Sequence, residues 1–97
     1  MLAEARSRIT RYTPDEVKAD PDLLIVDTRS IDERERTGVI PGSKHVPLSF
    51  LPWRAGDLAG RRVCLVCAQG YSSSLAAALL VELGVDAGDL IGGYEAW

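Results

Sequence analysis

Two continuous apolar runs, at residues 63–66 and 23–26, form the clearest pattern along the chain. Four apolar side chains in succession are typical of a strand that is buried on both faces of a parallel sheet. We therefore expect buried strands over residues 23–26 and 62–67. Weaker apolar clusters predict three shorter strands, at residues 9–11, 45–48 and 89–91. Because helical segments alternate with these strands, the pattern predicts an α/β fold with a mainly parallel sheet.

Two helices in the first half of the chain are predicted from their end signals. Thr13 is followed by Pro14 and Glu16, which is typical of a helix that starts with a capping box. The charged segment at residues 30–37 predicts a short helix, and Gly38 is expected to end it.

The second half of the chain holds one strong helical signal and one irregular segment. Residues 73–83 are rich in alanine and leucine, and Gly84 follows them as a C-terminal stop. Residues 50–60 contain a proline and two glycines, so we expect an irregular segment with at most one helical turn.

Cys67 stands where the second buried strand meets the loop that leads into this strong helix. At a helix start the backbone N–H groups lack intrahelical partners and the helix dipole is positive, so negative charge is favoured there. These donors are expected to lower the pKa of the Cys67 thiol and to leave a thiolate at neutral pH. Ligands of parallel sheets bind at the carboxyl ends of strands, which is where Cys67 falls. The sequence therefore predicts a reactive cysteine in an anion-binding loop.

Other chemistries for Cys67 need a second redox cysteine, a set of zinc ligands or a histidine base, and the sequence offers few candidates for these roles. Cys64 and Cys67 have the Cys-x-x-Cys spacing of redox pairs, but strand alternation places residues three apart on opposite faces, so we expect Cys64 in the core. A zinc site would need further ligands, and His45 is the only histidine. His45 is also the only candidate base for a cysteine-protease mechanism, and a loop or structural role is favoured for it. We therefore favour a mechanism in which backbone donors alone stabilise the sulfur anion.

Length, charge and composition restrict the partners. The 97 residues are expected to form one domain, residues 1–97. A net charge of -3 disfavours nucleic acid, because phosphate binding needs a clustered basic face. The longest apolar run, residues 75–81, is too short to span a bilayer, so no membrane partner is expected. The N-terminus has no apolar core of a secretory signal, and with only two cysteines the cytoplasm is the expected location.

Three residues outside the loop are candidates for structural support. Asp27 and Arg29 follow the first buried strand, where a carboxylate and a guanidinium group can brace neighbouring loops through charge-assisted hydrogen bonds. Trp97 is expected to be a packing anchor under the final strand. For Trp53 two interpretations stay open, a core position and a position beside Arg54 in the wall of the site.

Four segments of the chain together carry a family resemblance. They are Leu-Ile-Val-Asp-Thr-Arg at 24–29, Gly-Val-Ile-Pro-Gly-Ser at 38–43 followed by Val-Pro at 46–47, Cys-Ala-Gln-Gly-Tyr-Ser-Ser at 67–73, and Leu-Ile-Gly-Gly-Tyr-Glu-Ala-Trp at 90–97. Each motif alone is modest, but the four in this order are highly specific. The chain resembles a single-domain rhodanese over nearly its whole length, from about residue 9 onward.

The resemblance implies a fold and an activity. The fold is a three-layer α/β arrangement, with a five-stranded, mainly parallel sheet flanked by helices. Cys67 would accept a sulfane sulfur, become a persulfide and pass the sulfur to a thiophilic acceptor. The residues implied as the cradle for the anionic sulfur are Ala68, Gln69, Gly70, Tyr71, Ser72 and Ser73.

The resemblance also implies the kinds of partner. The sulfur donor is a small molecule or a protein, with thiosulfate as the usual test donor and the persulfide of a cysteine desulfurase as another candidate. The acceptor is a thiol, such as thioredoxin or glutathione, or cyanide. The resemblance implies no cofactor and no metal.

Three departures from the family pattern are visible. Many members have arginine at the loop position of Ser72, where it helps to bind an anionic donor, so weaker thiosulfate binding is expected here. Val39 stands where histidine is usual. Relatives also commonly continue for several residues after the position of Trp97, so a minimal or trimmed domain is expected here.

Two alternatives to sulfur transfer stay open. Phosphatases of this fold use a longer loop with arginine six residues after the cysteine, and Ser73 occupies that position here. A non-catalytic interaction module is the second alternative, although inactive relatives usually lose the cysteine that this chain retains.

Overall fold

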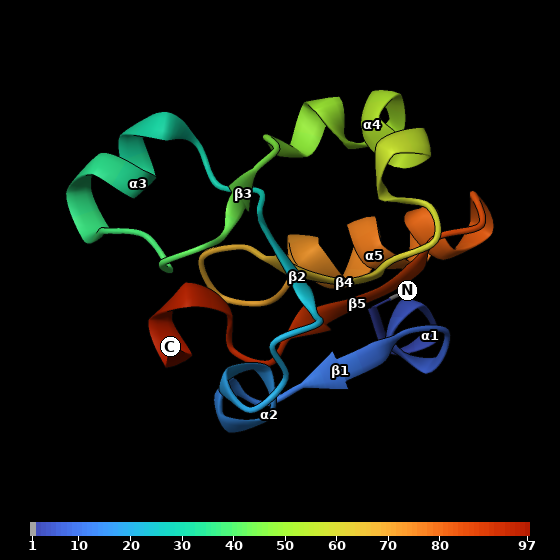
Figure 1. Ribbon diagram of the computed structural model, residues 1–97, viewed down its shortest axis with the longest axis horizontal. Helices are drawn as coiled ribbons and strands as arrows, with labels where there is room; N and C mark the ends of the chain where they lie inside the picture. The colour runs from blue at the N-terminus through green and yellow to red at the C-terminus, as the bar shows by residue number, and fades with distance from the viewer. Residues whose placement is uncertain (1) are drawn as a thin grey trace.

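Five parallel strands form a single sheet in the computed structural model, which describes residues 2–97 (Figure 1). The strand order is β1-β5-β4-β2-β3, and every neighbouring pair is parallel. The strands are β1 (Thr10–Tyr12), β2 (Leu24–Asp27), β3 (Lys44–His45), β4 (Arg62–Val66) and β5 (Asp86–Leu90). The predicted α/β fold with a parallel sheet is confirmed, with β4 at the centre of the sheet.

Five α-helices and two 3₁₀ helices surround the sheet. Their bounds are α1 (Leu2–Ser7), α2 (Pro14–Lys18), α3 (Ile31–Thr37), η1 (Leu48–Phe50), α4 (Leu51–Leu58), α5 (Ser72–Glu82) and η2 (Gly93–Ala96). None of these helices, among the residues that the structure describes, is long and apolar enough to cross a membrane.

The core has two parts, one on each face of the sheet. On one face, α4 and α5 pack against β4 side chains such as Val63 and Leu65, and α1 contacts α5. On the other face, Val17 of α2 packs with Cys64 and Val66 of the same strand. This alternation along β4 explains why its apolar run is continuous, since both faces of the strand are covered.

The predicted capping box at Thr13 is present, and the structure adds a second one at Ser30. The Thr13 hydroxyl accepts from the backbone N–H of Glu16, whose side chain accepts from the Thr13 N–H. Ser30 and Glu33 form the same reciprocal pair at the start of α3, and Gly38 ends that helix with a φ of 92°. These helix ends depend on residues three apart, which is why the sequence could predict them.

The prediction of an irregular segment at residues 50–60 is wrong, because Leu51–Leu58 form the helix α4. Pro52 lies in its first turn, where proline needs no N–H partner. A Cβ atom at Gly56 would meet no other atom within 4 Å, so no packing contact requires glycine there. Leu51 and Leu58 are seven residues apart and are both buried on one face of the helix. The burial of these two leucines stabilises the helix against the cost of its glycine.

Strand lengths also differ from the sequence prediction. β5 begins at Asp86, three residues earlier than expected, and includes Gly88. A side chain at Gly88 would overlap the carbonyl oxygen of Thr10, so the glycine permits the close approach of β1. The strand expected at residues 45–48 is reduced to Lys44–His45, because the chain turns into η1 after Pro47.

Candidate active site

Cys67 directly follows β4, and a loop over residues 68–71 leads from it into α5. The cysteine is 6% exposed. Gly70 turns the loop with a φ of 87°, which brings its backbone N–H within 3.0 Å of Cys67 Sγ. The Ser73 hydroxyl, on the first turn of α5, lies 3.2 Å from the same sulfur. The loop therefore wraps around the sulfur atom as the sequence led us to expect.

Hydrogen bonds lower the pKa of the Cys67 thiol below its ordinary value. Burial acts in the opposite direction and raises the pKa, because it disfavours the charged form. The hydroxyls of Ser73 and Ser72 and the backbone N–H groups of Ser73 and Gly70 outweigh this effect. The site therefore favours a thiolate through uncharged donors.

The remaining loop residues differ in their exposure. Ala68 and Ser72 are half-buried, Gly70 and Ser73 are buried, and Gln69 and Tyr71 face the solvent. Of these residues, Gly70, Ser72 and Ser73 donate hydrogen bonds to the sulfur, while Gln69 and Tyr71 lie at the surface.

The C-terminal segment holds the loop from outside, a role that the sequence did not indicate. The backbone N–H groups of Tyr94 and Glu95 donate to the carbonyl oxygens of Cys67 and Ala68, at 2.7 and 3.1 Å. Gly93 has a φ of 65°, and a Cβ atom there would overlap the Cys67 carbonyl oxygen. Glycine is needed at position 93 because two backbone segments meet there without space for a side chain, whereas a Cβ atom at Gly92 would overlap Ala96 Cβ.

A second support for the loop comes from the start of the chain. Arg6 of α1 donates from Nη2 to the carbonyl oxygen of Gly70 (3.0 Å) and from Nε to Ser74 Oγ (3.1 Å). Its guanidinium group also lies over the ring of Tyr71, 6.0 Å from the centroid. No motif of the sequence pointed to this contact, because Arg6 and Gly70 are 64 residues apart.

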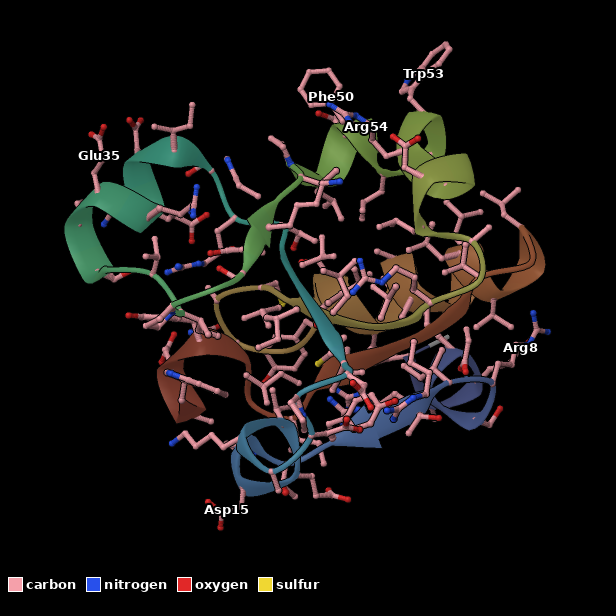
Figure 2. All side chains as sticks on the ribbon, viewed as in Figure 1. Arg8, Asp15, Glu35, Phe50, Trp53 and Arg54 are labelled. Carbon is pink, nitrogen blue, oxygen red and sulfur yellow. The ribbon has the colours of Figure 1, made fainter. Side chains whose placement is uncertain are left out.

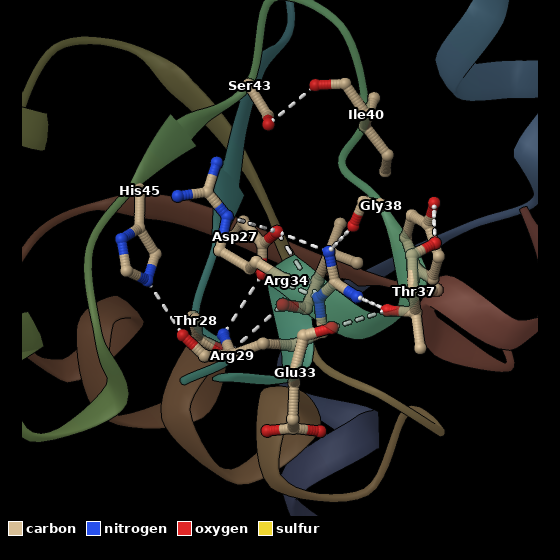
Figure 3. A network of polar contacts seen from close by, with 12 residues as sticks. Asp27, Thr28, Arg29, Glu33, Arg34, Thr37, Gly38, Ile40, Ser43 and His45 are labelled. Carbon is tan, nitrogen blue, oxygen red and sulfur yellow. Dashed lines mark hydrogen bonds and ion pairs between the residues drawn. The ribbon is translucent and has the colours of Figure 1, made fainter. Parts of the chain in front are cut away.

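Asp27 and Arg29 form a buried ion pair at the carboxyl end of β2 (Figure 3). Arg29 Nη2 lies 2.8 Å from Asp27 Oδ2, and both side chains are almost completely buried. Arg29 also donates to Thr37 Oγ1 and to the Gly38 carbonyl oxygen, and its guanidinium group lies 3.9 Å from the centroid of the Tyr94 ring. The pair therefore joins β2 to the end of α3 and to η2.

The pKa of Asp27 is lowered by this arrangement. Burial alone raises it, but hydrogen bonds from the side chain and backbone N–H of Arg29, with the charges of Arg29 and Arg34, outweigh that effect. The pKa of Arg29 is raised, chiefly by its hydrogen bond to Asp27. His45 lies beside the pair, and its Nε2 donates to the carbonyl oxygen of Arg29 at 2.7 Å.

The two tryptophans lie in different surroundings. Trp97 packs against the core cluster on the α2 face, and Lys18 Nζ lies 4.7 Å from the centroid of its ring. Trp53 is 84% exposed and points away from the sheet (Figure 2). Both interpretations of Trp53, a core position and a position in the site wall, are therefore wrong, because α4 directs this side chain into solvent.

Cys64 and Cys67 are free thiols in opposite environments. Cys64 belongs to the core cluster on the α2 face, and burial, assisted by the charge of Asp89, raises its pKa to about 12. Limited alkylation of the folded protein near neutral pH is therefore expected to label Cys67 and to leave Cys64 unmodified. Peptide mass mapping measures this selectivity, with the urea-unfolded protein as a control in which both cysteines react. Comparable labelling of Cys64 in the folded protein contradicts the prediction.

The comparison with family models matches residues 13–97 to the rhodanese-like domain. The chain belongs to this family. The rhodanese-like domain is 30% identical to a rhodanese-like domain protein from Staphylococcus aureus, with a TM-score of 0.83 over 92% of this chain and 91% of that one. It is 29% identical to a protein of unknown function from Rhodopseudomonas palustris, described as a possible tyrosine phosphatase, with a TM-score of 0.89 over 99% of this chain and 84% of that one.

A third solved structure extends the similarity of the fold. The human single-domain sulfurtransferase TSTD1 is 24% identical to this rhodanese-like domain, with a TM-score of 0.74 over 90% of this chain and 93% of that one. No curated protein matches the chain significantly. The rhodanese-like family and fold expected from the four motifs are therefore confirmed.

Proposed function

We propose that this rhodanese-like domain is a sulfurtransferase that carries a sulfane sulfur on Cys67 as a persulfide. The observation that supports this most strongly is the short contact of Cys67 Sγ with the backbone N–H of Gly70, 3.0 Å inside a loop that has no basic side chain. Uncharged donors around a buried sulfur suit an anion that is small and carries a single charge.

The proposed reaction has two steps. In the first, the Cys67 thiolate attacks the outer sulfur of the donor, an S–S bond forms, and the former partner of that sulfur leaves with the bonding electrons. With thiosulfate the leaving group is sulfite. In the second step an acceptor attacks the outer sulfur, and the electrons of the S–S bond return to Cys67 as a thiolate. With cyanide the product is thiocyanate.

The loop supplies what both steps need. Negative charge lies on the outer sulfur of the persulfide and then on Cys67. The N–H groups of Gly70 and Ser73 and the hydroxyls of Ser72 and Ser73 donate to Cys67 Sγ, and we assign the cradle of the outer sulfur to the loop from Ala68 to Ser73. The backbone contacts from Tyr94 and Glu95 hold this loop before substrate arrives, so little reorganisation is required. We assign structural support of the site to Asp27, Arg29 and Trp97.

A phosphatase activity is the second candidate, because one similar structure is described as a possible tyrosine phosphatase. A phosphate dianion needs a cationic partner at the loop. The loop offers no basic residue, and Arg6 approaches it through the carbonyl oxygen of Gly70 rather than through the sulfur. The geometry therefore favours sulfur transfer.

A panel of donors tests the proposal. The purified protein is incubated separately with thiosulfate, glutathione persulfide and an aryl phosphate. We expect intact and peptide mass spectrometry to show the mass of one added sulfur atom on Cys67 with at least one sulfur donor. A folded protein that gains no sulfur from any donor indicates a non-catalytic module instead. Aryl phosphate hydrolysis that depends on Cys67 indicates a phosphatase.

A further inference from the structure

Asp89 is a buried carboxylate that lies beneath the Cys67 loop and takes no part in the two proposed steps. It is completely buried on β5. Its Oδ2 accepts hydrogen bonds from Ser73 Oγ at 3.0 Å and from Ser74 Oγ at 2.6 Å. Arg11 of β1 pairs with the same carboxylate, at 2.9 Å from Nε to Oδ1 and 3.3 Å from Nη2 to Oδ2. Three side chains, two from α5 and one from β1, thus hold Asp89 in one position.

Ser73 links this carboxylate to the sulfur. Its Oγ lies 3.0 Å from Asp89 Oδ2 and 3.2 Å from Cys67 Sγ. A serine hydroxyl has one proton but can accept as well as donate. When Cys67 is a thiol, its S–H donates to Ser73 and Ser73 donates to Asp89, so every partner is satisfied. When Cys67 is a thiolate, Ser73 can donate to the sulfur only by giving up its bond to Asp89.

We propose that Cys67 and Asp89 compete for the single hydroxyl proton of Ser73, and that Asp89 is thereby a positioning residue that favours the persulfide over the free thiolate. This inference deepens the proposed sulfur transfer and rests on it for its role in turnover. In the persulfide the negative charge lies on the outer sulfur, so the inner sulfur no longer needs the Ser73 proton. Ser73 then keeps its bond to Asp89 at no cost. In the free thiolate one of the two acceptors must lose that bond.

The competition leaves the other donors of the sulfur in place. Ser72 and the N–H groups of Gly70 and Ser73 still donate to it, so the thiolate remains accessible. Asp89 keeps Ser74 and Arg11 when Ser73 turns away, so neither state leaves the carboxylate without partners.

Other charged or titratable groups lie near this chain of hydrogen bonds, but none of those that the structure describes bonds to Ser73 Oγ or to Cys67 Sγ. Arg6 of α1 bonds to Ser74 Oγ and to the Gly70 carbonyl oxygen. Cys64 of β4 stays protonated at neutral pH. At the ends of β2 and β5, Asp27 is paired with Arg29, and Tyr94 and Glu95 contact the loop through their backbone N–H groups.

A pair of serine variants tests the competition without changing Asp89. The hydroxyls of Ser72 and Ser73 both lie beside Cys67, but only that of Ser73 also contacts a carboxylate. We expect Ser72→Ala to move the midpoint of the pH profile of Cys67 alkylation to higher pH, because it removes a donor from the thiolate. Ser73→Ala is expected to raise the midpoint by less than Ser72→Ala does, because the Ser73 hydroxyl is shared with Asp89. A rise with Ser73→Ala equal to that with Ser72→Ala overturns the proposal.

A double-mutant cycle separates the proton competition from the simple field of the carboxylate. Asp89→Asn weakens the competing acceptor, so the midpoint is expected to fall and the alkylation rate at about pH 6 to rise about threefold. In the Ser73→Ala background, Asp89→Asn is expected to change the alkylation rate by less than half of the change that it causes in the wild-type background. An equal change in both backgrounds shows that Asp89 acts only through the electrostatic field of its carboxylate. No change in either background shows that Asp89 has a structural role only. Each of these two results overturns the proposal.

The alkylation profiles do not depend on sulfur transfer, so the two proposals can fail separately. If wild-type protein forms no persulfide, sulfur transfer is wrong whatever the profiles show. If it does form one, Asp89→Asn is expected to lower the persulfide-loaded fraction at a fixed ratio of glutathione persulfide to glutathione. An unchanged loaded fraction alongside shifted alkylation contradicts the role that we assign to Asp89 in turnover.

Discussion

Cys67→Ala is expected to reduce sulfur transfer from thiosulfate or glutathione persulfide to cyanide by about a thousandfold or more, because it removes the only group that can form the covalent intermediate. Thiocyanate formation under saturating donor measures the loss. The loop N–H groups remain in this variant, so donor can still bind but no S–S bond can form. A Cys67→Ala protein that keeps turnover near the wild-type rate would falsify the assignment.

Cys64→Ala is the matched control for this experiment. Cys64 is buried in the core cluster on the α2 face of β4, and its Sγ donates only a long contact to the Leu65 carbonyl oxygen within that strand. Its replacement is expected to lower stability modestly, through a small cavity, and to leave turnover within about twofold of wild type. Circular dichroism of both variants shows whether a loss of turnover comes from unfolding.

Asp27→Asn is expected to lower the free energy of unfolding by about 3 kcal/mol, because it leaves the buried Arg29 guanidinium without its charged partner. The pair is almost completely buried, and Arg29 bridges β2 to Thr37 and Gly38. Urea unfolding followed by circular dichroism measures the change in midpoint. A loss of this size is a large part of the 5–15 kcal/mol that stabilises a typical domain.

An exposed ion pair of the same chemistry provides the comparison. Arg54 and Asp57 lie 3.3 Å apart on α4, and more than half of each side chain is accessible to solvent. Asp57→Asn is expected to cost under about 1 kcal/mol, since water and salt screen the pair. Equal losses for the Asp27 and Asp57 variants contradict the importance of burial in this argument.

Acid should reduce the difference between wild type and the Asp27→Asn variant. The pKa of Asp27 is lowered in the folded protein, so its stabilising effect is fully present above the unfolded value of about 3.9 and is lost as the pH falls through the lower folded value. We therefore expect the difference in unfolding free energy to be constant near neutral pH and to shrink below about pH 4. A difference that grows on acidification contradicts this sign.

Features set by neighbours in the chain were predictable. The capping box at Thr13 involves residues three apart, and the buried strands follow from runs of apolar side chains. The position of Cys67 between a strand and a helix start was visible for the same reason, and with it the presence of backbone donors around the sulfur. The helix α4 was missed because proline and glycine disfavour helices locally, whereas the burial of Leu51 and Leu58 depends on the rest of the fold.

The surroundings of Cys67 were decided by contacts between distant parts of the chain. Arg11 and Asp89 are 78 residues apart, and they meet because β1 pairs with β5 at the edge of the sheet. Arg6 reaches the loop only because α1 packs on α5. No local pattern encodes the strand order or the packing of these helices. The sequence alone therefore determined that a cysteine lies between a buried strand and the start of a helix, and the tertiary structure decided which buried charges lie behind it, because a charge is tolerated in the core only where the fold brings it a partner.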